Sequence, residues 1–558
     1  MKISVLWKAP ELNPKDLKAK SIPILNPINI YGRCFNLSWL AFFVCFLSWF
    51  AFPPLMHGSI SKDLKLTAVD VANNNIVGLC ATLMARFFLG PIIDKVGPRI
   101  AMASILFIGA IPTAFVPLVN NLSGLHAIRF FIGILGGSFI PCQMWTTVFF
   151  DKNIIGTANA LAGGWGNAGG GVAFFVMPQI FADLMGDGYS LSRSWKLAFT
   201  IGPFIILMFV AALVFFFGQD CPEGKWSQRK DVLGLGVDNS LVTVVSVSNG
   251  ANVDEKTKQR QITLQLSNNG TGENNLHATE SVVLQKSVSH QTKNNIDSNL
   301  NPNDSNSVDI PIEDLINKDE IIEDPTVWTT LKYCFHYRTM LCALPYAITF
   351  GGELAVESIL SGLYTQVHPE WSQVEAGRWG SMMGLLNVVI RPLGGFISDL
   401  LYRKFKTTKA KKFWCLFCGF MQGVFLLWIG LVPSLKIHSL IAALMIMCVF
   451  MEMGNGANYG FVYFVNKKHP GIVAGSTGAF GNIGGVLFSL VFRYNVVNGK
   501  TNYFRSFWII GICSMATTAL CTLIPLREEV PELGEKEKEI IATDLESNSN
   551  GSFSCEKN

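Results

Sequence analysis

The 558-residue sequence has little charge for its length: 15% of its residues are Asp, Glu, Lys or Arg, whereas 50% are hydrophobic. A soluble chain of this length usually divides into several domains and carries more charge. Many apolar segments here reach about 20 residues, the length that crosses a hydrocarbon core of about 30 Å. The composition therefore predicts a polytopic membrane protein embedded in a lipid bilayer.

The sequence also lacks the patterns of several other protein classes. It has no basic groove with interleaved aromatic residues, so its net charge of +4 does not indicate nucleic-acid binding. It has no zinc-ligand pair, nucleophile elbow or phosphate-cradling lysine loop, so we predict neither an enzyme nor a metal or other cofactor. Cys415 and Cys418 form a lone CxxC within an apolar segment and are interpreted as small core residues. The polar N-terminus does not resemble a cleaved signal peptide.

Apolar segments predict twelve spanning helices in two groups of six. The first group lies at about 37–56, 71–92, 100–119, 124–149, 155–181 and 197–217. The second group lies at about 338–363, 376–398, 412–432, 439–464, 471–493 and 504–525. The predicted fold is thus an all-α membrane protein with two six-helix bundles, at 34–218 and 328–526.

Polar segments complete the chain at 1–33, 219–327 and 527–558. The middle one is rich in Asn and Ser and has too little apolar surface to fold alone, so we predict a disordered loop. Its serines and threonines are candidate substrates of kinases. Lysines and arginines concentrate in the loops on one side of the membrane, which predicts that both termini and the middle loop are cytosolic.

A twelve-residue pattern occurs twice, at 83–94 and 388–399. In each copy an arginine is followed by glycine after four residues and by aspartate after eight, which makes Arg86 and Arg391 equivalent. Eight residues of helix place each arginine about 12 Å from its aspartate, near the middle of the membrane. A charge at this depth is costly and most often has a function. The two halves are therefore predicted to contribute one functional arginine each.

Two interpretations of these arginines remain open. A guanidinium has planar, forked donors that match a planar oxyanion, so the pair predicts a shared anion-binding site. The alternative is that each arginine is neutralised by an intramembrane glutamate, for which Glu353, Glu357 and Glu452 are the candidates.

Two glycine-rich strings, 166–170 and 481–485, share the pattern G-N-x-G-G at corresponding positions of the two halves. Small residues let helices approach closely in lipid, so helix packing accounts for the glycines. It does not account for Asn167 and Asn482, whose amides need either a neighbouring helix or a ligand. Parallel repeats of this kind are the plan of a large transporter class that holds its substrate between the halves.

The segment 90–99 resembles the motif between helices 2 and 3 of the major facilitator superfamily. This resemblance implies that Asp94 and Arg99, with Asp399 and Arg403 in the second half, act as gating latches at the cytosolic ends during alternating access. The strings 163–171 and 475–485 resemble the paired signatures of the nitrate/nitrite porter family, and the long middle loop resembles its fungal branch. Over both bundles, the resemblance implies a proton-coupled, high-affinity nitrate transporter of the plasma membrane.

The resemblance also implies a set of substrate-binding residues for nitrate or nitrite. They are the two clamping arginines Arg86 and Arg391, the asparagine Asn167 with its repeat partner Asn482, the tyrosine Tyr346, and the phenylalanines Phe139 and Phe350 that sandwich the flat anion. Without the resemblance, each single aromatic residue would be interpreted as core packing.

Proton coupling requires a titratable group that senses the site. Glu353 and Glu357, one turn apart on helix 7, and Glu452 on helix 10 are the candidates, with pairing to an arginine as the alternative role. Three functions therefore remain: nitrate/proton symport, exchange of nitrate for nitrite or transport of another small anion, and nitrate sensing that does not need flux.

Overall fold

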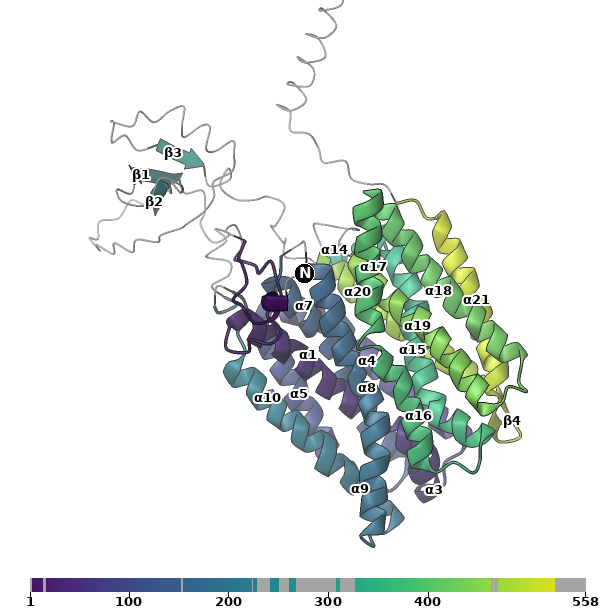
Figure 1. Ribbon diagram of the computed structural model, residues 1–558. Helices are drawn as coiled ribbons and strands as arrows, with labels where there is room; N and C mark the ends of the chain where they lie inside the picture. The colour runs from purple at the N-terminus through teal and green to yellow at the C-terminus, as the bar shows by residue number, and fades with distance from the viewer. Residues whose placement is uncertain are drawn as a thin grey trace, which may run out of the picture. The chain divides into compact units, whose positions relative to one another are not determined.

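The computed structural model describes residues 3–13, 17–151, 154–222, 224–227, 241–249, 260–266, 308–311, 327–462, 465 and 470–526; the side chains of a few of them, including Asp94, are not described. Figure 1 shows the purple and blue helices of the first half beside the green and yellow helices of the second half. The acidic tail from Arg527 lies outside the described residues.

The first half contains the α-helices α1 (Ile30–Trp49), α2 (Pro53–Leu55), α3 (Ser61–Asp63), α4 (Ala68–Val96), α5 (Pro98–Ala114), α6 (Leu122–Gly133), α7 (Phe139–Phe149), α8 (Ile155–Gly186), α9 (Leu191–Phe199) and α10 (Ile205–Phe217). Between them lie the π-turns η2 (Met56–Ile60) and η5 (Thr200–Phe204) and the 3-10 turns η3 (Val116–Leu118) and η4 (Ile134–Ser138), and η1 (Ile3–Leu6) precedes them.

The second half contains α14 (Val327–Cys334), α15 (Tyr337–Val367), α16 (Gln373–Leu386), α17 (Ile390–Phe405), α18 (Thr408–Leu431), α19 (Ile437–Val462), α20 (Pro470–Tyr494) and α21 (Tyr503–Leu523). The short strands β4 (Val496–Val497) and β5 (Lys500–Thr501) form a hairpin between α20 and α21.

Eleven helical segments of the described chain are long and apolar enough to cross a membrane. The twelfth predicted span is α4, which has 29 residues. It is long enough to cross, but Arg86 and the run of asparagines at 73–75 make it less apolar. These polar residues lie on the helix that carries the first predicted site arginine.

Two details of the helices differ from the predictions. The first span does not end at Pro53 and Pro54, because these residues occupy the first turn of α2, where proline is tolerated, and helical structure continues to Asp63. The eighth span is not continuous: it breaks at 387–389, between α16 and α17. Arg391 therefore lies in the first turn of a new helix.

The middle segment is predicted to be a disordered loop, and most of it lies outside the described residues, so this stays a prediction. The strands β1 (Leu241–Asn249), β2 (Arg260–Leu266) and β3 (Val308–Pro311) form an antiparallel sheet in the order β2-β1-β3, with a bulge between Val244 and Ser246. β1 is rich in valine, a β-branched residue that favours strands. Most of the candidate kinase sites lie outside the described residues.

The helices with the glycine strings form the interface between the two halves. α8 of the first half packs against α16 and α17, and α20 of the second half packs against α4. At one crossing, the backbone of Gly171 lies against Ser381 and Gly384 and leaves no room for a side chain. Within the second half, Gly484 meets the carbonyl of Ala347 on α15 in the same way. Packing therefore explains these glycines, as the sequence predicts.

We expect Gly484→Ala to disrupt the protein more than Gly485→Ala. The added methyl group at 484 would overlap the backbone of Ala347, whereas at 485 it would come within 3.3 Å of the side chain of Leu354, which can move. Overpacking against backbone costs about 1–3 kcal/mol. The yield of monodisperse protein in detergent, measured by size-exclusion chromatography, should fall for Gly484→Ala. Equal yields for the two variants would contradict this account of the packing.

Candidate anion-binding site

Arg86 is buried on α4 and reaches across the interface between the halves. Its Nε donates to the carbonyl of Gly136 in η4 at 3.0 Å, and its Nη1 donates to the carbonyl of Gly478 on α20 at 3.0 Å. Its Nη2 is buried and has no hydrogen-bond partner in the described part of the chain. No described carboxylate lies within salt-bridge distance of Arg86 (the side chain of Asp94 is not described). Arg86 therefore keeps one unpartnered N–H donor, and no described ion pair compensates its positive charge.

Arg391 is equally buried but has a different set of partners. Its Nη2 donates to the hydroxyl of Tyr346 at 2.8 Å, and its Nη1 donates to Oδ1 of Asn387 at 3.2 Å. The same Nη1 lies 3.5 Å from Oε2 of Glu353 and 3.8 Å from Oε2 of Glu452. The two equivalent arginines therefore differ: one is paired with glutamates, as the alternative interpretation expects, and the other is not.

Asparagines hold these carboxyl groups in place. Asn387, at the break between α16 and α17, donates to Oε1 of Glu353 at 2.8 Å. Asn455 on α19 donates to Oε2 of Glu353 at 2.8 Å and to Oε2 of Glu452 at 3.2 Å. The break in the eighth span thus lets one amide connect Arg391 with its carboxylate.

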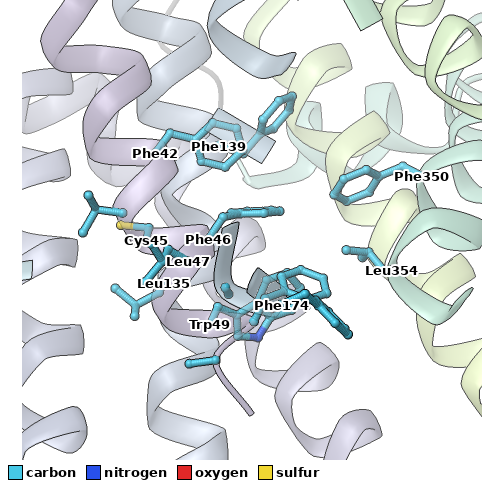
Figure 2. Close-up of a cluster of buried hydrophobic side chains, with 14 of the residues drawn as sticks. Phe42, Cys45, Phe46, Leu47, Trp49, Leu135, Phe139, Phe174, Phe350 and Leu354 are labelled. Carbon is cyan, nitrogen blue, oxygen red and sulfur yellow. The ribbon is translucent and has the colours of Figure 1, made fainter. Parts of the chain in front are cut away.

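Aromatic rings bring the two arginines to one place. The guanidinium carbon of Arg86 lies 5.1 Å from the centre of the Phe350 ring, and that of Arg391 lies 5.7 Å from the same centre. Arg86 also lies 5.3 Å from the Phe139 ring. Figure 2 shows Phe139 and Phe350 on helices of opposite halves. Cations over aromatic faces are stabilised by the ring quadrupole, so the rings favour two positive charges in this site.

Two tyrosines extend the aromatic wall. Tyr346 stacks on Phe350 with an interplanar angle of 7°, and Tyr459 meets both Tyr346 and Phe139 edge to face. Tyr459 was not among the sequence predictions. The internal repeat could have identified it. Residues 456–459 in the tenth predicted span correspond to residues 136–139 in the fourth, and the last residue of that segment is Phe139.

A small space between the halves adjoins Arg391. Its empty volume is about 160 Å³, and it is too narrow to admit a water molecule. The first half contributes Phe139, Gln143 and Asn159 to its lining, and the second half contributes Arg391, Asn455 and Tyr459. Residues from both halves therefore line one site.

The two predicted asparagines lie next to this site. Asn482 on α20 donates to the carbonyl of Gly478, which also accepts from Arg86, and its Oδ1 has no partner in the described structure. Asn167 is one helical turn after Gly163, which lies beside Arg391. Both polar atoms of its buried amide are without partners among the described residues. A buried amide with no partner costs stability, so these groups suit a ligand.

The third glutamate lies apart from the arginines. Glu357 is one turn beyond Glu353 on α15 and is buried. Its Oε1 lies against the backbone of Gly384 and has no hydrogen-bond partner in the described chain. The structure thus brings Glu353 and Glu452 to Arg391 and leaves Glu357 at the crossing of α8 and α16.

The predicted gating residues have partners other than each other. Arg99 pairs with Asp220 at 3.3 Å, and burial raises the pKa of Asp220 while Arg99 opposes this shift. Asp399 pairs with Lys411 at 2.6 Å, whereas Arg403 is exposed. Lys411 also donates to a carbonyl of α19. The side chain of Asp94 lies outside the described structure, so the gating role of these residues stays a prediction.

Contacts between the halves lie on both sides of the site. On the side of the basic loops, Asp399 lies next to Gly156 at the start of α8. On the opposite side, Gln373 accepts a hydrogen bond from Ser59 at 2.7 Å, and Arg493 donates to Asn73 at 2.6 Å. These contacts are consistent with the absence of room for water in the site.

The profile of the Major Facilitator Superfamily matches residues 38–489. The chain belongs to this superfamily. The solved structure of a bacterial homologue of the human lysosomal transporter Spinster has a similar fold, with a TM-score of 0.50 and 11% sequence identity over 88% of this chain and 95% of the other. The predicted fold class, an all-α membrane protein with the major facilitator fold, is therefore confirmed.

Named relatives indicate which members of the superfamily this chain resembles. Nitrate transporter 2.2 of Chlamydomonas reinhardtii is 27% identical and aligns over 91% of this chain and 82% of its own length. Elsinochrome transporter 1 of Elsinoe fawcettii is 29% identical over 95% of this chain and all of its own. Further relatives named as nitrate transporters come from Arabidopsis thaliana, Oryza sativa and Nostoc punctiforme. The resemblance to nitrate/nitrite porters is confirmed, whereas the resemblance to the fungal branch of that family has little support.

The hydroxyl of Tyr346 should matter for anion binding. We expect Tyr346→Phe to raise the apparent KM for the transported anion about tenfold, because a hydrogen bond to a charged group contributes about 1.5–3 kcal/mol. The ring stacking on Phe350 would remain. The matched control is Tyr364→Phe on the same helix, since the hydroxyl of Tyr364 is buried and has no partner in the described chain. Equal KM values for the two variants would show that the hydroxyl of Tyr346 does not contribute to anion binding.

Proposed function

We propose that this protein imports nitrate, with nitrite as a second substrate, across the plasma membrane by alternating access, coupled to protons. The observation that carries the proposal is the convergence of Arg86 and Arg391, one from each half, on the ring of Phe350 at the closed interface. Relatives that are named as nitrate transporters support the choice of anion.

The chemistry of nitrate suits the site. The ion is flat, carries one charge and does not take up a proton near neutral pH, so it needs fixed positive donors rather than a titratable partner. The unpartnered Nη2 of Arg86 and the amide of Asn167 supply donors, and Phe139 and Phe350 supply flat apolar faces.

The positions of the contacts between the halves support the proposal of alternating access. The site is at the interface of the two halves, and separate sets of contacts close it on either side. If one set opens while the other holds, the site becomes accessible from one side of the membrane at a time. We infer that the contact of Asp399 with Gly156 belongs to the set on the cytosolic side, with Asp399 held by its ion pair with Lys411.

Two alternatives give different outcomes in transport assays. An exchanger would show nitrate uptake that is stimulated by internal nitrite and is independent of a pH gradient. A sensor would bind nitrate without transporting it. Uptake of labelled nitrate by cells that lack their own uptake system, with and without a pH gradient, separates these cases from symport.

Replacing each site arginine by lysine tests the proposed role of the forked donors. We expect Arg86→Lys and Arg391→Lys each to lower nitrate uptake at least about 100-fold, because lysine keeps the charge but loses the planar fork and its hydrogen bonds. Uptake of labelled nitrate, normalised to surface expression, measures this. Arg378→Lys is the matched control, since Arg378 is exposed on α16. Near-normal uptake by either site variant would contradict the proposed function.

A further inference from the structure

Arg391 faces two carboxyl groups that lie close together. Glu353 and Glu452 both lie within 4 Å of its Nη1, and Nδ2 of Asn455 donates to Oε2 of each. Two ionised carboxylates that share one site repel each other, which favours a proton on one of them. We propose that Glu452 carries the transported proton and that nitrate and this proton bind together at Arg391. This inference rests on the proposed function.

The hydrogen bonds distinguish the two carboxyl groups. Both oxygens of Glu353 accept amide N–H groups at 2.8 Å, from Asn387 and Asn455, which is the arrangement of an ionised carboxylate. Glu452 receives only the longer, 3.2 Å contact from Asn455, and its Oε1 has no partner among the described residues. Glu452 is therefore the carboxyl group that takes up the proton.

Charge balance links this proton to the anion. With Glu452 protonated, Arg86, Arg391 and Glu353 together leave one positive charge, which one nitrate ion cancels. When nitrate and the proton have both left, ionised Glu452 restores the balance by pairing with Arg391. Nitrate without the proton leaves the site negative, and the proton without nitrate leaves it positive. Unbalanced charge in a buried site is costly, so the two ions are expected to move together.

Several other charged or titratable side chains surround Glu452. The charged and titratable side chains around it are Glu353, Glu357 and Tyr346 on α15, Arg391 on α17, Arg86 on α4, Cys415 on α18, and Cys448 and Tyr459 on its own helix. Glu357 has no described cation within salt-bridge distance, and an isolated buried carboxyl stays protonated, so it does not enter the balance.

The test uses the full-length protein in liposomes and measures two kinds of flux. The first is accumulation of labelled nitrate driven by an inward proton gradient, with the membrane potential clamped. The second is exchange of external labelled nitrate for internal nitrate at equal pH. We expect Glu452→Gln to lose the accumulation, down to the level of protein-free liposomes, while it keeps exchange clearly above that level. Glu452→Asp should restore accumulation, and Glu370→Gln, at an exposed loop position, should behave as wild type.

Each other outcome has a defined meaning. If Glu452→Gln still accumulates nitrate like the wild type, Glu452 is not the proton carrier and the inference is wrong. If it loses exchange as well, the carboxyl group belongs to the nitrate site rather than to the coupling step, and the inference is again wrong. If the wild-type protein shows neither flux with nitrate, it is the proposed function that fails.

Discussion

The structure depends on keeping two guanidinium groups charged inside a membrane-spanning protein. An isolated charge at this depth costs about 2.5–3.5 kcal/mol on insertion scales, so each arginine needs compensation. Arg391 obtains it from Glu353, which two asparagines hold in place. Arg86 has only carbonyl oxygens and aromatic faces. In the proposed function, the positive charge of Arg86, which no described ion pair compensates, attracts the anion.

The arrangement of helices serves this site. The break between α16 and α17 places Arg391 and Asn387 in reach of Glu353, and the 3-10 turn η4 presents the carbonyl of Gly136 to Arg86. Glycines on α8 let the backbone approach the second half closely enough to close the site. Interruptions of helices are tolerated in a membrane where they face a buried site instead of lipid.

The sequence predicts the fold well, because long apolar segments and the internal repeat are direct consequences of membrane insertion. It also singles out Arg86 and Arg391, since a charge in an apolar run stands out, whereas their aromatic neighbours were predicted only from the family resemblance. It does not predict Asn387 or Asn455, because an asparagine in a helix gives no sign of which carboxylate it will bind. The difference between the two arginines was also hidden, since the repeat makes them look alike.

The most direct test of the central claim is a structure of the protein determined in the presence of nitrate. The account predicts planar density between Arg86 and Arg391, flanked by the rings of Phe139 and Phe350, with at least one guanidinium nitrogen of each arginine within hydrogen-bond distance of an oxygen of the ion. Density for nitrate at any position that contacts neither arginine, with Arg391 still paired to Glu353, would contradict it.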